Sequence, residues 1–411
     1  MYDVIVVGAG PTGSHIASRL AQWGYKVAVL ERKQTIGGKV CCSGIISREC
    51  HESFRLSNDI VLREASSAKF FVPSGRYLRL KKDTVQAYVV DRSAFDIALA
   101  RRAQEAGAEY FLRAMVTDVL PAKDGCQVEA DCLGKKQVFQ ARAVVIACGF
   151  GSNLPEHLGM GTIADFIFGA QTEVNTQLDE VEIYFDQKVA PGGFAWLIPT
   201  SNGRGLVGLL SRRNAYPLLE GLLSKFIAEG KIRPTEFKIR QKVLPLGTLR
   251  RTYGNRVLVA GEAAGQVKAT TGGGIYFGLL CADLAVNTLR RAFLADDLSP
   301  RQLSAYQREW QRKIGPDLRI GNAARRLYDK ISQTQMERLF DIIKTCKIDE
   351  QMLEREDFFF DFHGRLILKV LRQPKLLFAL ATPKLLFPIG GIAALWLNLK
   401  NESGLGRSYR S

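Results

Sequence analysis

The N-terminal end of the chain alternates apolar runs with one amphipathic segment. Tyr2 to Val7 and Lys26 to Leu30 are short and almost uninterrupted apolar runs, which are typical of strands buried on both faces of a parallel sheet. Between them, residues 11–23 carry Ile16, Ala17 and Leu20 at helical spacing. The pattern predicts a strand, a helix and a second strand, which together form one βαβ unit.

Farther along, polar and apolar positions alternate with a period of two. This period is typical of strands with one buried face, and it predicts an antiparallel sheet from residues 69–72, 77–80, 181–185 and 206–210. A helical pattern lies between the second and third of these segments, at residues 95–106. Residues 143–147 and 256–260 are again almost continuous apolar runs, which are typical of buried parallel strands. Helical patterns dominate from Ile275 onward. The chain therefore crosses between two sheets more than once.

A glycine motif lies at the end of the first expected strand. Gly8, Gly10 and Gly13 form a GxGxxG pattern that follows a strand and opens a helix, and Glu31 ends the next strand. Gly8 permits a tight turn, Gly10 lets a pyrophosphate approach the backbone, and Gly13 lets helix and strand pack closely. Glu31 is placed to accept hydrogen bonds from a ribose diol. The motif predicts a dinucleotide site, with NAD as a rival ligand and a ligand-free glycine turn as the alternative.

A second glycine-rich segment changes the prediction from NAD to FAD. Residues 261–265 read Gly-Glu-Ala-Ala-Gly after the third apolar run, and residues 270–275 read Thr-Thr-Gly-Gly-Gly-Ile. In flavoproteins with one Rossmann domain, an acid at this strand end binds the ribityl chain, and a glycine-rich helix start presents N–H groups to the flavin. The acid is usually Asp and here is Glu262, so the exact ribityl contact differs. A plain strand-to-helix turn is the alternative.

Composition narrows the class of protein and its expected cellular compartment. The 411 residues, 46% hydrophobic and 24% charged, can bury a core larger than one typical domain. The eight cysteines show neither disulfide-framework nor zinc-ligand spacing, and no secretory signal precedes the first strand, so we expect free thiols, no metal site and a cytoplasmic location. The formal charge of +16 suits nucleic acid, anionic lipid or phosphorylated substrates. No nucleic-acid-binding motif is present, which disfavours nucleic acid.

Five segments together resemble the geranylgeranyl reductase family, within the para-hydroxybenzoate-hydroxylase-like flavoproteins. They are GAGPTG at 8–13, Cys42-Ser43-Gly44, DRSAFD at 91–96, PGGFAWLIP at 191–199, and GEAAG with TTGGGI. The resemblance covers about residues 2–290. It implies that the following residues contact FAD: Gly8, Gly10, Thr12, Gly13, Glu31, Cys42, Ser43, Gly44, Arg92, Val116, Glu262, Gly273, Gly274 and Ile275.

Two of these positions, Arg92 and Cys42, and two others, Phe194 and Trp196, also have interpretations of their own. Arg92 can neutralise pyrophosphate oxygens bidentately, or it can form a surface ion pair with Asp91 or Asp96. Phe194 and Trp196 lie two apart on an expected strand, so they can wall a substrate cavity above the isoalloxazine ring or belong to the sheet core. Cys42 is the candidate catalytic proton relay. Its alternative is an inert buried cysteine.

The resemblance implies saturation of C=C bonds in a polyprenyl chain on a lipid, a diphosphate or a quinone. Aromatic hydroxylases of the group carry an Asp-Gly element where this chain has Cys148-Gly149, and no second GxGxxG is present. A ferredoxin-like electron donor is therefore favoured over NAD(P)H. The alternatives are a flavin monooxygenase or halogenase, a menaquinone reductase, and a non-catalytic flavin-binding protein.

The C-terminal end is both basic and apolar. Residues 361–411 carry eight Lys or Arg against two acids, interleaved with apolar clusters that Pro383 and Pro388 interrupt. This pattern favours a segment that lies on a membrane surface over one that spans the membrane. The alternative is a helical hairpin that caps the core or a dimer interface. We expect a cytoplasmic protein that is peripheral to the membrane.

The sequence thus predicts an α/β protein with a single Rossmann-type FAD-binding domain interleaved with an antiparallel-sheet substrate domain. The FAD-binding domain is expected at residues 1–60, 92–160 and 240–295, and the substrate domain at 61–91 and 161–239. Residues 296–411 form a helical, basic C-terminal region.

Overall fold

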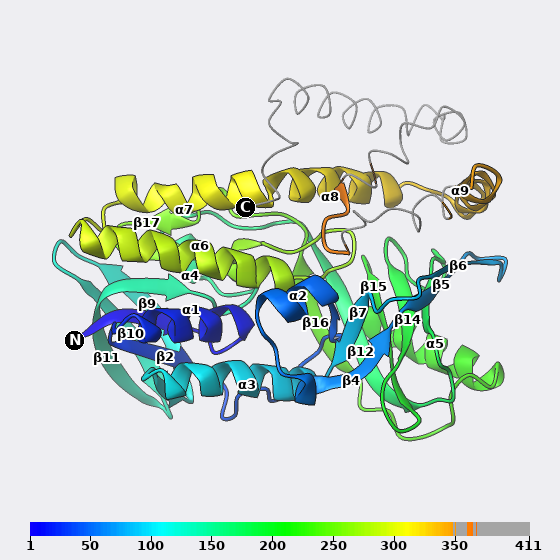
Figure 1. The fold of residues 1–411 in the computed structure, drawn as a ribbon, viewed down its shortest axis with the longest axis horizontal. Coiled ribbons are helices and arrows are strands. Elements are labelled where there is room, and N and C mark those ends of the chain that lie inside the picture. Colours follow the sequence, from blue (N-terminus) through cyan, green and yellow to red (C-terminus); the bar gives the residue numbers. More distant parts are fainter. Residues whose placement is uncertain (348–349, 351–359, 365–366, 368–411) are drawn as a thin grey trace. The chain divides into compact units, whose positions relative to one another are not determined.

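The computed structural model describes residues 1–347, 350, 360–364 and 367, in two compact units (Figure 1). Unit 1 comprises Met1–Val40, Asp91–Phe166 and Leu244–Gly315. Unit 2 comprises Cys41–Val90, Ile167–Val243 and the described residues from Pro316 on. Both units are discontinuous in sequence.

Unit 1 is built on an eight-stranded sheet with the order β17-β18-β11-β1-β2-β8, to which β9 and β10 are added through β11. The strands β18, β11, β1, β2 and β8 run parallel to their neighbours in this order. The strand bounds are β1 Tyr2–Val7, β2 Val27–Glu31, β8 Glu109–Leu112, β9 Ala114–Pro121, β10 Cys126–Cys132, β11 Lys135–Ile146, β17 Tyr253–Gly254 and β18 Val257–Val259.

The parallel strands are apolar on both faces because both faces are covered. Ile5 and Val7 of β1 pack in one cluster with Val119 of β9 and Val128 of β10. Val4 and Val6, on the other face of β1, are fully buried as well. This two-sided burial is the reason that the first strand reads as a continuous apolar run.

The helices of unit 1 are α1 (Pro11–Gln22), α3 (Arg92–Glu105), α4 (Leu154–His157), α6 (Ile275–Leu294) and α7 (Pro300–Lys313), with the 3₁₀ turn η2 (Gly261–Ala264). Helix α1 packs against α3 and α6 (Figure 1). The helix expected at 95–106 begins earlier, at Arg92. The reason is that the Asp91 carboxylate accepts hydrogen bonds from the backbone N–H groups of Ser93 and Ala94 and caps the helix there.

Unit 2 is built on a seven-stranded sheet with the order β16-β12-β15-β14-β13-β5-β6. Strands β12, β15, β14 and β13 are each antiparallel to the next in this order. Strands β13 and β5 are parallel, and β5 and β6 form an antiparallel hairpin. The strand bounds are β5 Ser67–Phe71, β6 Tyr77–Lys81, β12 Phe166–Asn175, β13 Val181–Tyr184, β14 Phe194–Pro199, β15 Arg204–Ser211 and β16 Arg240–Pro245.

A three-stranded sheet, ordered β3-β7-β4, completes unit 2. Its strands are β3 (Ile45–Ser47), β4 (Val61–Ala65) and β7 (Ala87–Val90). Because β3 pairs with β7, residues 41–60 cluster with unit 2, whereas the sequence grouped them with the nucleotide-binding segments. The helices are α2 (Arg48–Ser53), α5 (Ala215–Ala228), α8 (Gly315–Tyr328) and α9 (Gln333–Thr345), with the 3₁₀ turn η1 (Asn58–Ile60).

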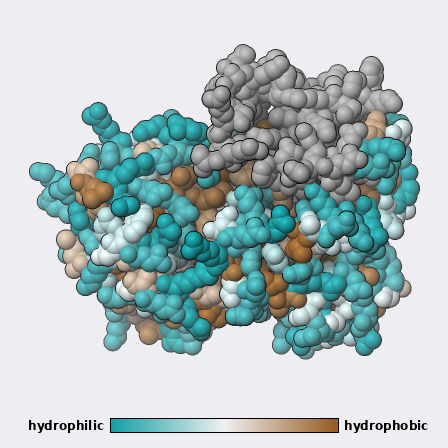
Figure 2. All heavy atoms as spheres, viewed as in Figure 1, coloured by the Kyte–Doolittle hydropathy of each residue, from teal (hydrophilic) through white to brown (hydrophobic). Residues whose placement is uncertain are grey.

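The described part of the expected helical C-terminal region, which begins at residue 296, is divided between the two units. Helix α7 belongs to unit 1 and nearly all of α8 to unit 2. Figure 2 shows that the visible face of the described residues is mostly hydrophilic, with separate apolar areas. Within the described part of the chain, no helix combines the length and apolar content needed to cross a bilayer. Almost all of the basic tail at 361–411 lies outside the described residues.

Candidate functional site

The glycine motif forms the turn between β1 and α1. Gly8 has a φ of +105°, and a Cβ there would stand 2.7 Å from the carbonyl oxygen of Ala147, so only glycine fits the turn. A Cβ on Gly13 would stand 2.0 Å from the carbonyl oxygen of Gly8, so Gly13 is required for the close packing of the helix on the turn. At Gly10 no atom lies within 4 Å of the Cβ position, so its backbone faces open space at the helix N-terminus.

Glu31 is fixed beside this turn. Its carboxylate accepts the N–H of Ala9 at 2.8 Å and the N–H of Lys33 at 2.9 Å. The carboxylate is therefore held at the carboxyl end of β2, next to the glycine turn. Each of its oxygens keeps capacity for a further hydrogen bond, which a ribose diol can donate.

Thr12 connects the glycine turn to the second motif. A Cβ on Gly261 would stand 2.6 Å from Thr12 Oγ1, and one on Gly278 would stand 2.5 Å from the same oxygen. Both glycines therefore let α1 approach η2 and α6 closely. Because Glu262 lies in η2 next to Gly261, the two motifs that are more than two hundred residues apart in sequence meet in unit 1.

Helix α6 begins directly after the Gly-rich run. Gly274 is its N-cap residue and Ile275 its first residue, and Gly274 has no side chain that could cap the helix. A Cβ on Gly273 would stand 2.9 Å from Lys268 Cε, and one on Gly274 would stand 3.1 Å from Val267 Cγ2. The loop that leads into this 20-residue helix is therefore tight, and the positive end of the helix dipole suits an anionic or electron-rich ligand group.

Arg92 is buried at the start of α3. Its guanidinium binds the Asp96 carboxylate at 2.7 Å, with side-chain exposures of 10% and 9%, so the predicted ion pair exists but is not a surface pair. Among the described residues, Arg92 Nε is buried and has no hydrogen-bond partner. A buried guanidinium with an unused donor suits a phosphate group.

Val116 belongs to β9, where it pairs with Ala130 and packs against the core cluster of unit 1. The residues of the predicted FAD site that lie in unit 1 are Gly8, Gly10, Thr12, Gly13, Glu31, Arg92, Val116, Glu262, Gly273, Gly274 and Ile275. The open Cβ position at Gly10 and the unused donor of Arg92 are compatible with a bound phosphate group.

The Cys42-Ser43-Gly44 element lies in unit 2, before β3. The carbonyl of Cys42 accepts a hydrogen bond from Gln171 Nε2 at 3.1 Å, and the carbonyl of Gly44 accepts one from Val90 N at 2.9 Å. The neighbouring Cys41 thiol donates to the Arg240 carbonyl, and burial together with Cys42 raises the pKa of Cys41 to about 11. The Cys41 thiol therefore stays protonated at neutral pH.

Phe194 and Trp196 project from one face of the seven-stranded sheet, with ring centroids 5.8 Å apart. Helix α5 covers the other face, where Ala195 and Leu197 of the same strand pack with Leu219 and Phe226. Phe185 extends the aromatic face, with its ring 6.1 Å from that of Phe194. Trp196 is only 8% exposed, so it is buried while it lines this face.

Helix α8 binds the Pro-Gly-Gly turn that precedes Phe194. Arg325 donates to the carbonyl of Gly192, and the Tyr328 hydroxyl donates to that of Gly193 at 2.5 Å. Asp329 then links Arg325, at 3.3 Å, to Arg212, at 2.7 Å. The sequence prediction did not include these contacts, because the four charged or phenolic groups form no motif.

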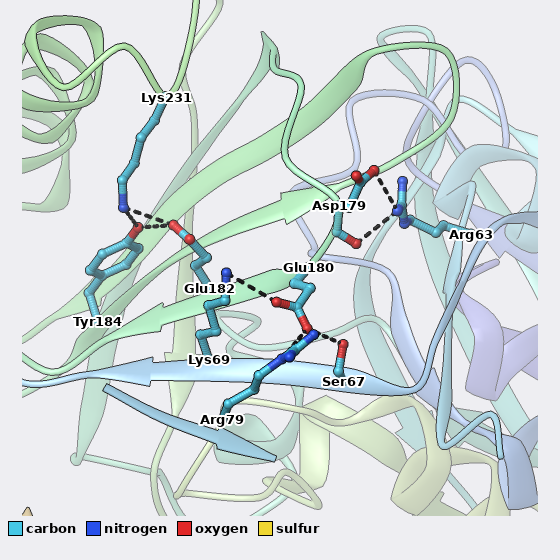
Figure 3. Close-up of polar contacts among 9 residues, drawn as sticks. All are labelled: Arg63, Ser67, Lys69, Arg79, Asp179, Glu180, Glu182, Tyr184 and Lys231. Carbon is cyan, nitrogen blue, oxygen red and sulfur yellow. Dashed lines mark hydrogen bonds and ion pairs between the residues drawn. The ribbon is translucent and has the colours of Figure 1, made fainter. Parts of the chain in front are cut away.

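A cavity of about 250 Å³ opens on the α5 side of unit 2. Phe71, Tyr184, Phe185, Leu222 and Lys231 are among its lining residues. In Figure 3, Lys231 reaches Glu182 Oε2 at 2.9 Å and Tyr184 Oη at 2.6 Å, and the Tyr184 hydroxyl donates to the same carboxylate. None of the predicted site residues lines this cavity.

Comparisons with known proteins give a family. The family model described as "Lycopene cyclase protein" matches residues 3–366. A digeranylgeranylglycerophospholipid reductase of Methanocaldococcus jannaschii is 31% identical over 356 residues, which are 84% of this chain and 90% of the relative. Digeranylgeranylglycerophospholipid reductase 2 of Methanopyrus kandleri is 30% identical and covers 90% of this chain and 95% of its own length.

Solved structures agree on the fold. A geranylgeranyl bacteriochlorophyll reductase-like protein of Thermoplasma acidophilum superposes with a TM-score of 0.81 at 21% identity, covering 92% of this chain and 98% of the other. A flavoprotein/dehydrogenase of Cytophaga hutchinsonii gives 0.67 at 16%, covering 97% and 99%, and the flavin-dependent brominase Bmp2 gives 0.67 at 15%, covering 90% and 98%. The predicted α/β fold class is confirmed.

Proposed function

Because the chain belongs to the family of the digeranylgeranylglycerophospholipid reductases, and the lycopene cyclase family model also matches this chain, we propose that it is an FAD-dependent reductase of geranylgeranyl-type chains. The family resemblance predicted from the motifs is confirmed. The substrate would be a lipid whose prenyl chains carry C=C bonds. The observation that carries the proposal is that one chain combines a dinucleotide cradle in unit 1 with an aromatic sheet face in unit 2.

The residues of unit 1 would bind FAD. Glu31 would accept hydrogen bonds from the adenosine ribose, and Arg92 would neutralise pyrophosphate charge with its unused Nε. The N–H groups at Gly274 and Ile275, which follow Gly273 at the helix start, would stabilise negative charge on the reduced flavin ring. When bound, FAD supplies the hydride for reduction of the C=C bond.

The residues of unit 2 would bind the lipid and deliver a proton. Phe194 and Trp196 would pack against the prenyl chain and exclude water from it. Reduction of an isolated alkene adds a hydride to one carbon and a proton to the other. The Cys42 thiol would donate that proton, and solvent would then protonate the thiolate.

Three further assignments belong to the proposal. The electron donor would be ferredoxin-like, because Cys148-Gly149 replaces the Asp-Gly element of NADPH-dependent hydroxylases. The protein would act in the cytoplasm at the membrane surface, with the basic tail toward anionic lipid. The FAD-binding and substrate domains would follow the boundaries predicted from the sequence, with residues 41–60 moved to the substrate side because β3 pairs with β7.

Mass spectrometry of lipids tests the proposal. The dithionite-reduced, FAD-loaded protein is incubated without oxygen with digeranylgeranylglycerophospholipid, prenyl diphosphates or menaquinone. Products heavier by pairs of hydrogens are expected, and fragmentation will place the change in the tail or in a quinone ring. If no mass changes under any of these conditions, the proposed function is wrong.

Two other reactions give different masses in the same experiment. A product heavier by one oxygen atom, formed only in air, would identify a monooxygenase, and incorporation of halide would identify a halogenase like the brominase that shares the fold. A product of unchanged mass and altered retention would identify a cyclase, which is the activity in the description of the family model.

A further inference from the structure

Three strands place three residues in one row on the aromatic face of the seven-stranded sheet. In register, Gln171 of β12 lies opposite Gly208 of β15, and Gly208 lies opposite Trp196 of β14. Residues directly opposite each other on antiparallel strands project from the same face. Gln171, Gly208 and Trp196 therefore share the face opposite α5.

Gly208 leaves room for the Trp196 indole between the two outer strands. A Cβ on Gly208 would stand 2.4 Å from Trp196 Cζ2 and 2.6 Å from Cε2, so the indole lies over this glycine. Cε2 is bonded to Nε1, so the edge that carries the indole N–H lies above the middle strand of the row. Neighbouring strands are about 4.8 Å apart, which leaves Gln171 one strand away from Gly208.

Both polar groups on this row are buried and unused. Among the described residues, Trp196 Nε1 and Gln171 Oε1 each lack a hydrogen-bond partner, and both residues are only 8% exposed. An unsatisfied buried donor or acceptor costs about 1–3 kcal/mol. Two such groups of opposite kind on one row of a sheet indicate a ligand that both accepts and donates.

The orientation of the Gln171 amide is fixed by its other end. Nε2 donates to the carbonyl of Cys42 at 3.1 Å, and an inverted amide would place two acceptor oxygens against each other. Oε1 is therefore the free end. The same amide thus connects the unused acceptor to the segment that carries the candidate proton relay.

We propose that Trp196 Nε1 and Gln171 Oε1 together bind one hydroxyl group on the aromatic face of unit 2. A hydroxyl accepts one hydrogen bond and donates another, which matches this pair, whereas an ether, a carbonyl or an ammonium matches only one of the two groups. The surrounding face is apolar, with Phe70 and Phe185 stacked at 6.4 Å and Phe185 next to Phe194. The hydroxyl comes from ordered water or from an alcohol group of the ligand.

Binding measurements on the oxidised, FAD-loaded full-length protein test this site without turnover. Geranylgeraniol and its methyl ether are titrated by calorimetry, because the ether retains the acceptor and lacks the donor. If an alcohol of the ligand occupies the site, the alcohol binds about fivefold or more tightly than the ether. Gln171→Met and Trp196→Phe then each reduce this preference to less than twofold.

Thr172→Val is the matched control, because Thr172 is the next residue of β12, is buried, and points to the α5 face. It should keep the preference of the wild type. If the wild type binds both probes equally, a high-resolution crystal structure decides. An ordered oxygen within hydrogen-bond distance of Trp196 Nε1 and Gln171 Oε1 would support the site with water as its source.

Equal binding together with no such oxygen would overturn the proposal, as would a preference that survives in both Gln171→Met and Trp196→Phe. The site is independent of the proposed reductase activity. Its failure would appear in the binding data and the crystal structure, whereas failure of the reductase proposal would appear in the product masses.

Discussion

The adjacent cysteines Cys41 and Cys42 are expected to have different roles, one structural and one chemical. The Cys41 thiol donates to the carbonyl of Arg240 and has a pKa raised to about 11, whereas the backbone of Cys42 is held by Gln171. We expect Cys42→Ser to lower anaerobic reduction of the lipid by roughly 10²- to 10⁴-fold, the usual contribution of a positioned proton donor. Cys41→Ser should retain turnover within a few fold.

Single-turnover rates at constant flavin content are the measurement, with FAD absorbance as the check that the cofactor is still bound. Equal rates for Cys42→Ser and the wild type would remove Cys42 from the mechanism. A large loss in Cys41→Ser alone would transfer the role to its neighbour.

Glu180 controls part of the acid stability of unit 2. Partial burial alone would raise its pKa, but hydrogen bonds from Ser67, Lys69 and Arg79 outweigh burial and lower the pKa from 4.5 to about 2 (Figure 3). A carboxylate with a lowered folded-state pKa stabilises the protein above its unfolded pKa, and this contribution is lost as the pH falls from 4.5 toward 2.

Glu180→Gln should therefore flatten the decline of the unfolding midpoint between pH 4.5 and 2, as followed by urea unfolding at a series of pH values. Asp179→Asn is the control, because Asp179 is 88% exposed and forms a surface pair with Arg63. An acid limb that is as steep in Glu180→Gln as in the wild type would contradict the assigned role.

At the scale of elements, α8 acts as a support for the Pro-Gly-Gly turn. Tyr328→Phe removes the donor to the Gly193 carbonyl, so we expect a loss of roughly 1–2 kcal/mol in the free energy of unfolding. Because Phe194 follows this turn, KM for the lipid should rise while FAD affinity stays unchanged. Lys330→Ala, two residues farther on and exposed, should change neither quantity.

Urea unfolding, lipid KM and flavin titration measure these three effects. A variant with wild-type stability and KM would show that α8 merely packs beside the turn. A loss of FAD binding equal to the loss of lipid binding would instead indicate general unfolding.

Sequence patterns predicted the elements with local signals and missed those that depend on distant pairing. The βαβ unit was predictable because Gly8, Gly13 and the two apolar strands are contiguous in sequence. The placement of residues 41–60 was not, because it follows from the pairing of β3 with β7. Gln171 was not predictable either, since a single glutamine forms no motif and its partner Cys42 is 129 residues away.

For the whole molecule, the net charge of +16 and the basic tail predict binding to anionic membranes. A chain that ends before Gln373 should bind phosphatidylserine vesicles at least tenfold more weakly in a flotation assay, and added salt should weaken binding of the full chain. Flavin content and reduction of a detergent-solubilised lipid should persist in the truncated chain. Unchanged vesicle binding after truncation would exclude the tail as the membrane-binding segment.

The central claim is that reducing equivalents pass from the bound flavin to a prenyl C=C bond. Anaerobic single-turnover spectroscopy tests it most directly: the stoichiometrically reduced, FAD-loaded protein is mixed with digeranylgeranylglycerophospholipid, and the visible absorbance of oxidised flavin is followed. We predict that the oxidised spectrum returns with one saturated double bond for each flavin. A flavin that stays reduced in the presence of each prenyl substrate, and reoxidises only when oxygen enters, would contradict the account.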